Sequence, residues 1–229
     1  MPGPLAVLWE DPHGLAISKP AGILTQRTGA GSDEVSLEDL VRRYLRPEDP
    51  ASAYLGTVHR LDRPVSGVIL WAKTPRSARR WADQFARREV RKEYWAIVEG
   101  DTTGLGESGR WVDWLAPPNA SGRARPVEPG TPGSLLASTA YEVVRSPGLA
   151  DGLAWLRLQP ETGRTHQLRA QGAARGTPIV GDATYGSSVP FPAGIALHAR
   201  SLAVEHPVRR CPMVVEAPLP DSWSGWLGS

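Results

Sequence analysis

The sequence contains a single cysteine, Cys211, so the chain cannot form a disulfide bond within itself. No stretch approaches the roughly 20 apolar residues that a membrane-spanning helix needs, and the first residues lack the positive charge and apolar run of a signal peptide. The histidines show no metal-ligand spacing and are scattered at His13, His59, His166, His198 and His206. These absences predict a soluble, cytoplasmic protein for which neither a metal nor an organic cofactor is implied.

Lysine is scarce as well. Lys19, Lys73 and Lys92 are the only lysines, so arginine supplies most of the positive charge. The net charge of +2 is too small to indicate a nucleic-acid partner by itself. A chain of this length can form one large domain or two small ones, and burial of about 70% of its unfolded surface allows a real core. We expect a single domain over residues 1–229 and a monomer.

One carboxylate has an unusual setting. Asp62 lies between Arg60 and Arg63 in a segment that turns at residues 64–67 and continues into an apolar, strand-like stretch at residues 68–72. A turn directly before a core strand holds its side chains rigidly, and neighbouring positive charge keeps a carboxylate ionised. Such a group can attack an electrophilic carbon, or it can form a structural ion pair that shapes the turn. The residues of this turn alone favour the ion pair.

Two strands and two helices are predicted in the first part of the chain. The strands, at residues 5–9 and 15–18, flank a turn. The first helix begins after Ser36, with Asp39 placed as in a capping box. Its inward face is expected to contain Leu37, Leu40, Val41, Tyr44 and Leu45. The second helix follows Thr74, with Pro75 at its first position. Its inward stripe is expected to contain Ala78, Trp81, Ala82, Phe85 and Val90.

Arginines crowd the second helix outside this stripe, at Arg76, Arg79, Arg80, Arg87 and Arg88. A charged, solvated face is the ordinary explanation of such a pattern. Only Asp83 and Glu89 offset these charges, however, so the helix indicates contact with a polyanion equally well.

Residues 117–134 are rich in proline, glycine and serine and lie close to Arg110, Arg123 and Arg125. A loop longer than about 12–15 residues is uncommon unless it is functional or mobile. We predict a loop insertion here rather than a linker between domains, because strand patterns resume at residues 137–144 and 153–158. Residues 165–175 should then form a helix that Gly176 closes.

Four segments stand in order along the chain: the run HRLDRPVSG around Asp62, KEYWAIVEG at 92–100, TGRTHQLR at 162–169 and GTPIVGDATYG at 176–186. Together they resemble the RluA-type family of RNA pseudouridine synthases. The shorter segments KPAG at 19–22, LHA at 197–199 and EHP at 205–207 resemble the family too. The resemblance therefore spans roughly residues 5–215.

The resemblance implies an α+β fold with a mixed, largely antiparallel central sheet flanked by helices, and a central cleft. It also implies that Asp62, Tyr94 and Arg169 converge in that cleft. Asp62 would be the nucleophile, Tyr94 would stack on the target uracil and relay a proton, and Arg169 would hold Asp62 in position. The reaction detaches uracil from its ribose, rotates it and rejoins it through carbon five. The sequence leaves open whether Asp62 acts at the ring or at the sugar.

The resemblance further implies a structured RNA substrate, either tRNA or rRNA, whose uridine is flipped out of its stack. Arg60 would fill the space that the base leaves, and Arg164 lies in a turn where a helix end could contact phosphate. His59 is expected to stabilise the turn before Asp62 through a hydrogen bond. The side chains of Arg79, Arg80, Arg87 and Arg88 are expected to contact the phosphate backbone of the RNA.

Val65 and Gln171 depart from the family, which usually has threonine and often histidine at these positions. We expect no S4-type RNA-binding module before the first strand, so RNA recognition would rest on the catalytic domain. Two alternatives remain open. One is a catalytically silent RNA-binding protein, and the other is a glycoside hydrolase in which Asp182 or Glu161 joins Asp62 as a second acid.

Overall fold

A computed structural model describes residues 5–27, 34–144 and 149–226 of the chain. Residues 1–4, on which the expectation about a signal peptide rests, lie outside the described residues. Within the part that the structure describes, no helix is long and apolar enough to cross a membrane.

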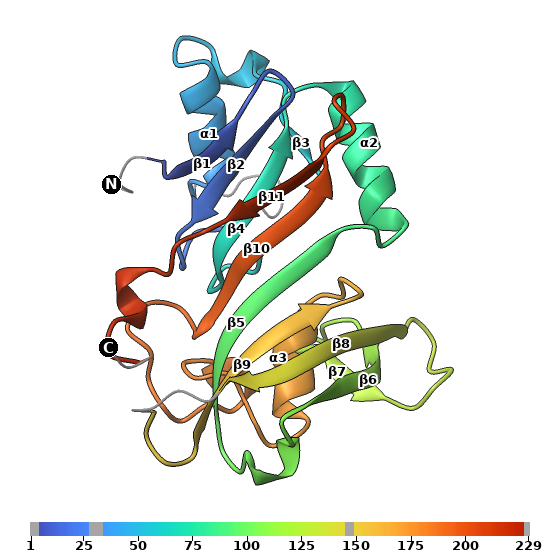
Figure 1. The fold of residues 1–229 in the computed structure, drawn as a ribbon, viewed down its shortest axis with the longest axis vertical. Helices are drawn as coiled ribbons and strands as arrows, with labels where there is room; N and C mark the ends of the chain where they lie inside the picture. The colour runs from blue at the N-terminus through green and yellow to red at the C-terminus, as the bar shows by residue number, and fades with distance from the viewer. Residues whose placement is uncertain (1–4, 28–33, 145–148, 227–229) are drawn as a thin grey trace. The chain divides into compact units, whose positions relative to one another are not determined.

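The chain divides into two compact units (Figure 1). Unit 1 consists of Met1–Val90 and Ala199–Leu219, and unit 2 consists of Arg91–His198 and Pro220–Ser229. Over the described residues, three α-helices flank mixed, mostly antiparallel β-structure, which confirms the predicted α+β class. That the two units act as one domain stays a prediction.

The strands of unit 1 follow one another across the sheet in the order β1 (Val7–Glu10), β2 (Gly14–Lys19), β4 (Ser66–Ala72) and β10 (Leu197–Glu205), which belongs to unit 1 from Ala199 onward. Strand β3 (Gly56–Thr57) lies beside β4, and β11 (Pro212–Glu216) lies beside β10. Strands β4 and β10 run in the same direction (Figure 1). Gly67 permits their close approach, because a Cβ atom there would lie 2.2 Å from the carbonyl oxygen of Ala199. A side chain at position 67 would therefore push β4 away from β10.

Helices cover both faces of this sheet. Helix α1 (Leu37–Leu45) buries Leu37 and Val41 against one side of β2 and β4, while α2 (Pro75–Ala86) buries Trp81 against the other. Burial on both faces explains why β4 is an uninterrupted apolar run. The capping box of Ser36 and Asp39 is present as predicted. Tyr44 is 46% exposed, so its predicted place in the inward face was wrong.

Helix α2 begins as predicted, because the Thr74 side chain accepts a hydrogen bond from the backbone N–H of Ser77 at 3.2 Å. Its buried stripe differs from the prediction: Ala82 is exposed, whereas Ser77 and Gln84 are buried. Burial of Gln84 costs little, because its amide bonds both the N–H and the carbonyl of Glu205.

The sheet of unit 2 is antiparallel, with strands in the order β5 (Arg91–Glu99), β9 (Leu153–Pro160), β8 (Leu135–Val144), β6 (Ser108–Ala116) and β7 (Arg125–Val127). The predicted strands at 137–144 and 153–158 are confirmed. Strand β7 lies inside the segment 117–134 that was predicted as a loop. Helix α3 (Gln167–Ala173) begins two residues later than predicted, after His166 in the left-handed conformation at φ 55°.

Candidate functional site

The turn that carries Asp62 is held on both sides. The buried hydroxyl of Thr25 donates to the carbonyl of Leu61 at 2.7 Å and accepts from the backbone N–H of the same residue at 3.2 Å. The N–H of Val65 donates to the carbonyl of Asp62 at 3.1 Å and closes the turn. Asp62 itself is half-buried. The backbone that carries Asp62 is therefore held in place within unit 1, as predicted.

Lys19 binds the other side of this turn. It is fully buried, and its ammonium group donates to the carbonyls of Pro20, Arg63 and Val65 at 3.0, 3.1 and 2.7 Å. Burial lowers the pKa of Lys19 to about 7, while the Asp62 carboxylate opposes that shift. This role of Lys19 was not predicted from the sequence. The sequence feature that could have indicated it is the position of Lys19, one of only three lysines, in the segment KPAG.

The residues flanking Asp62 have different environments. The exposed guanidinium of Arg63 pairs with Glu34 at 2.6 Å and donates to the carbonyl of Gly22 at 3.0 Å. Arg60 is exposed. His59 accepts a hydrogen bond at Nε2 from the backbone N–H of Leu70 at 2.9 Å. The predicted stabilising bond of His59 therefore exists, but its partner is strand β4.

Replacing Lys19 by methionine should cost roughly 2–4 kcal/mol of unfolding free energy, because three carbonyls lose their donor and the one on Val65 stays buried. Urea unfolding measures this change. Lys73→Met is the matched control, since Lys73 forms a partly exposed pair with Glu10 at 2.7 Å and should cost under about 1 kcal/mol. Equal losses in both variants would contradict the role of Lys19.

The stability of Lys19→Met should also differ from wild type in its pH dependence. Between pH 7 and 10.5 the unfolded chain keeps a proton on Lys19 that the folded chain has released, because burial lowers the folded pKa to about 7 from 10.5. The unfolding free energy therefore rises with pH in this window. The methionine variant lacks that rise, so its deficit relative to wild type should grow from pH 7 towards pH 10.

In unit 2, Tyr94 and helix α3 share one face of the sheet. Tyr94 is half-buried in β5 and lies opposite Leu158 of β9. The register of β9 with β8 places Leu158 on the same face as Thr139. Thr139 in turn bonds the side chains of Gln167 and Gln171 on α3, at 2.9 and 2.7 Å. Tyr94 thus lies on the face that the helix of Arg169 covers.

Arg169 is only 5% exposed, although a mid-helix arginine is usually a surface residue. Its Nε and Nη2 atoms donate to the two carboxylate oxygens of Asp182 at 2.6 and 2.9 Å. This bidentate geometry fixes the plane of the guanidinium. Asp182 lies in the resembling segment GTPIVGDATYG, but the sequence alone did not predict it as the partner of Arg169. Asp62 belongs to the other unit, so its pairing with Arg169 and its convergence with Tyr94 stay predictions.

The two departures from the family are both buried. Val65 is 3% exposed, and its carbonyl is one of the acceptors of Lys19. Gln171 has no exposed surface, and its amide donates to Asp113 at 2.7 Å while accepting from Thr139. Both residues therefore have packed or hydrogen-bonded positions in the fold.

The arginines expected to bind RNA differ in their surroundings. Arg79, Arg87 and Arg88 are exposed, and the last two lie beyond the end of α2. Arg80 donates to the backbone carbonyl of Pro207. Arg164 donates to the carbonyl of Leu136 at 3.0 Å. Exposure therefore supports some of the six predicted arginines, Arg60 included, more than others, and contact with RNA stays a prediction for all of them.

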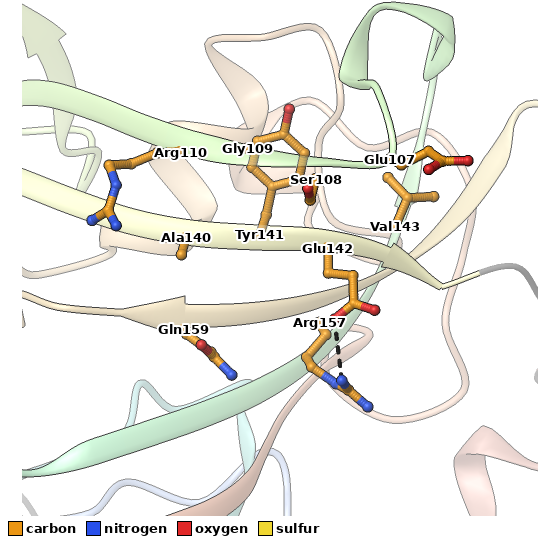
Figure 2. A pocket seen from close by; sticks show the side chains of 10 residues that line it. All are labelled: Glu107, Ser108, Gly109, Arg110, Ala140, Tyr141, Glu142, Val143, Arg157 and Gln159. Atoms are coloured by element: carbon orange, nitrogen blue, oxygen red, sulfur yellow. Dashed lines mark hydrogen bonds and ion pairs between the residues drawn. The ribbon is translucent and has the colours of Figure 1, made fainter.

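A separate groove of about 820 Å³ lies along β6, β8 and β9 (Figure 2). Arg157 pairs with Glu142 within it at 3.1 Å, and Arg110 at its edge pairs with Glu161. Its positive charges thus already have acidic partners, and none of the predicted catalytic residues lines it. Among the described residues, no group of three or more His, Cys, Asp or Glu side chains is placed to hold a metal ion.

Comparisons with known proteins agree with one another. The sequence profile of the family described as RNA pseudouridylate synthase matches residues 13–174. The tRNA pseudouridine synthase C of Salmonella typhi is 32% identical over 98% of this chain and 91% of its own. The dual-specificity RNA pseudouridine synthase RluA of Escherichia coli K12 is 36% identical over 93% of both chains. The solved structure of human RNA pseudouridylate synthase domain containing 1 has a TM-score of 0.75 at 26% identity, covering 96% of this chain and 86% of its own. The chain therefore belongs to the RNA pseudouridylate synthase family.

Proposed function

We propose that this protein isomerises uridine to pseudouridine in a structured RNA, either tRNA or rRNA, with Asp62 as the nucleophile. The observation that carries the proposal is the turn held by Lys19 and Thr25, which presents a half-buried carboxylate on a fixed backbone. The names of the relatives support an RNA substrate, since they include a tRNA enzyme and a dual-specificity RNA enzyme. The cytoplasmic location and the monomeric state expected above stay predictions.

The isomerisation changes only the attachment of the base. The bond between the ribose and ring nitrogen breaks, uracil rotates and a bond to carbon five forms. The proton on carbon five leaves, and the freed ring nitrogen takes up one proton. The carboxylate of Asp62 would assist either by bonding to the ring or by acting at the sugar. Tyr94 would stack on the uracil and relay the departing proton, and Arg169 would orient Asp62.

The test is chemical mapping of pseudouridine in tRNA and rRNA transcripts incubated with the purified protein. We expect new pseudouridine at a defined position in at least one of these RNAs. Tight binding without isomerisation would instead favour the catalytically silent RNA-binding alternative. The glycoside hydrolase alternative has less support, because its candidate acids are engaged: Asp182 pairs with Arg169, and Glu161 pairs with Arg110.

The arginines around α2 should contribute to affinity through counterion release. Arg87→Gln with Arg88→Gln removes two exposed charges, whereas Arg79→Gln with Arg80→Gln removes one exposed charge and one that binds the Pro207 carbonyl. We expect the slope of log affinity against log salt to fall in magnitude by about two for the first variant and about one for the second.

Affinity measured across a salt series with the target RNA and an unrelated RNA checks this expectation. Both RNAs should lose a similar factor, because backbone contacts carry no sequence information. Wild-type slopes in both double variants would show that this face is only solvated. The RNA would then be sought at Arg123 and Arg125, which are both exposed.

A further inference from the structure

Tyr185 lies three residues after Asp182, at the end of a short 3-10 turn. The guanidinium carbon of Arg169 lies 4.9 Å from the centre of the Tyr185 ring. Arg169 is therefore held in its plane by the Asp182 carboxylate and across its face by an aromatic ring. A planar guanidinium with both kinds of contact can neither rotate nor tilt freely.

The hydroxyl of Tyr185 joins two other segments. It accepts a hydrogen bond from the backbone N–H of Ala124 at 2.8 Å. The carbonyl of Ala124 lies 3.3 Å away, and Nδ1 of His166 lies 3.0 Å away. A phenol donates one proton and accepts two bonds, so these neighbours can satisfy it fully. Tyr185 thus connects the start of α3 to the chain between β6 and β7.

The residue before α3 is strained. His166 has φ 55° and ψ 22°, a left-handed conformation that disfavours side chains other than glycine. Such a conformation costs on the order of 1–3 kcal/mol and persists only where its surroundings impose it. The contact with Tyr185 and the four hydrogen bonds of the neighbouring Gln167 side chain supply that restraint. The first turn of α3, which carries Arg169, is therefore held in one orientation.

We propose that Tyr185 is a positioning residue of the isomerisation, whose ring orients Arg169 and whose hydroxyl fixes α3 to Ala124. The proposal rests on the proposed function, because it assigns Tyr185 to the same reaction. The ring and the hydroxyl of Tyr185 would each contribute to the reaction rate. Both contributions would act through the position of Arg169.

Two substitutions separate these contributions. Tyr185→Phe keeps the ring and removes the hydroxyl, whereas Tyr185→Leu removes both. Tyr44→Phe is the matched control, since Tyr44 is exposed and its hydroxyl donates a surface hydrogen bond to Glu10 at 2.9 Å. With saturating target RNA we expect the single-turnover rate to fall roughly 10-fold in Tyr185→Phe and on the order of 100-fold in Tyr185→Leu. RNA affinity should stay within about twofold of wild type, and Tyr44→Phe should react like wild type.

A purely structural role predicts a different outcome. In that case Tm would fall, but the folded variants, assayed well below their Tm, would turn over like wild type. A double-mutant cycle with Arg169→Lys adds a second criterion, because Tyr185→Leu should slow the reaction much less when the guanidinium is already gone. Independent, multiplicative losses in this cycle would overturn the proposal. A wild-type protein that makes no pseudouridine would overturn the proposed function itself, whereas an active wild type with fully active Tyr185 variants would overturn only the role of Tyr185.

Discussion

Asp62→Asn should abolish pseudouridine formation while leaving RNA affinity within about twofold of wild type. The substitution keeps the size of the side chain and removes the anion that is proposed to attack the ring or the sugar. The bonds from Lys19 and Thr25 to neighbouring carbonyls do not involve the carboxylate, so the turn should persist. Loss of a nucleophile commonly costs roughly 10⁴-fold or more, so we expect a single-turnover rate lower by at least that factor.

The measurement pairs a single-turnover assay with an RNA-binding titration on the same preparation. Asp83→Asn is the matched control, because it makes the same chemical change at an exposed position on α2. Peptide mass analysis must exclude deamidation of the new asparagine back to aspartate. Wild-type turnover by verified Asp62→Asn protein would overturn the assignment of the nucleophile. Loss of RNA binding together with activity would show that Asp62 supports the turn rather than the chemistry.

Arg169→Ala should lower the unfolding free energy by about 3–5 kcal/mol, because it leaves the Asp182 carboxylate buried without this partner. The side chains of Arg169 and Asp182 are only 6% and 2% exposed. The variant should also lose isomerase activity, since Arg169 is proposed to orient Asp62. Arg175→Ala is the control, because Arg175 pairs with Asp113 at 3.0 Å with side-chain exposures of 27% and 15%. That control should cost about 1 kcal/mol.

A double variant separates stability from function. Arg169→Met with Asp182→Leu removes both charges together, and replacing a buried ion pair by apolar residues is often neutral for stability. Urea unfolding should therefore show recovery relative to Arg169→Ala, while the isomerase assay should show none. Recovery of both would mean that Arg169 serves the fold alone. Wild-type stability in Arg169→Ala would contradict the buried pair.

Local signals predicted much of the fold. Ser36 with Asp39 and Thr74 with Pro75 mark helix starts by contacts within a few residues, so a sequence pattern can reveal them. Periodicity failed where burial depends on a distant partner. Gln84 is buried because the backbone of Glu205 satisfies its amide, and no local pattern contains that information.

For the candidate site too, local sequence segments were informative and distant contacts were not. Asp62, Tyr94 and Arg169 could be named from segments that resemble a family, but their supporting contacts could not. Lys19 bonds carbonyls more than 40 residues away, and the partner of Arg169 lies 13 residues further along the chain. Such contacts arise only when the chain folds, so they are visible in the structure and hidden in the sequence.

The bond between Tyr185 and Ala124 has a consequence for how this protein can diverge. The hydroxyl of Tyr185 bonds the backbone N–H and carbonyl of residue 124, and that position is 3% exposed. The anchor therefore requires only a small residue there. The adjoining residues 117–123 can change in length and sequence while their point of attachment stays the same. Such changes would leave the start of α3 attached to Ala124 through Tyr185.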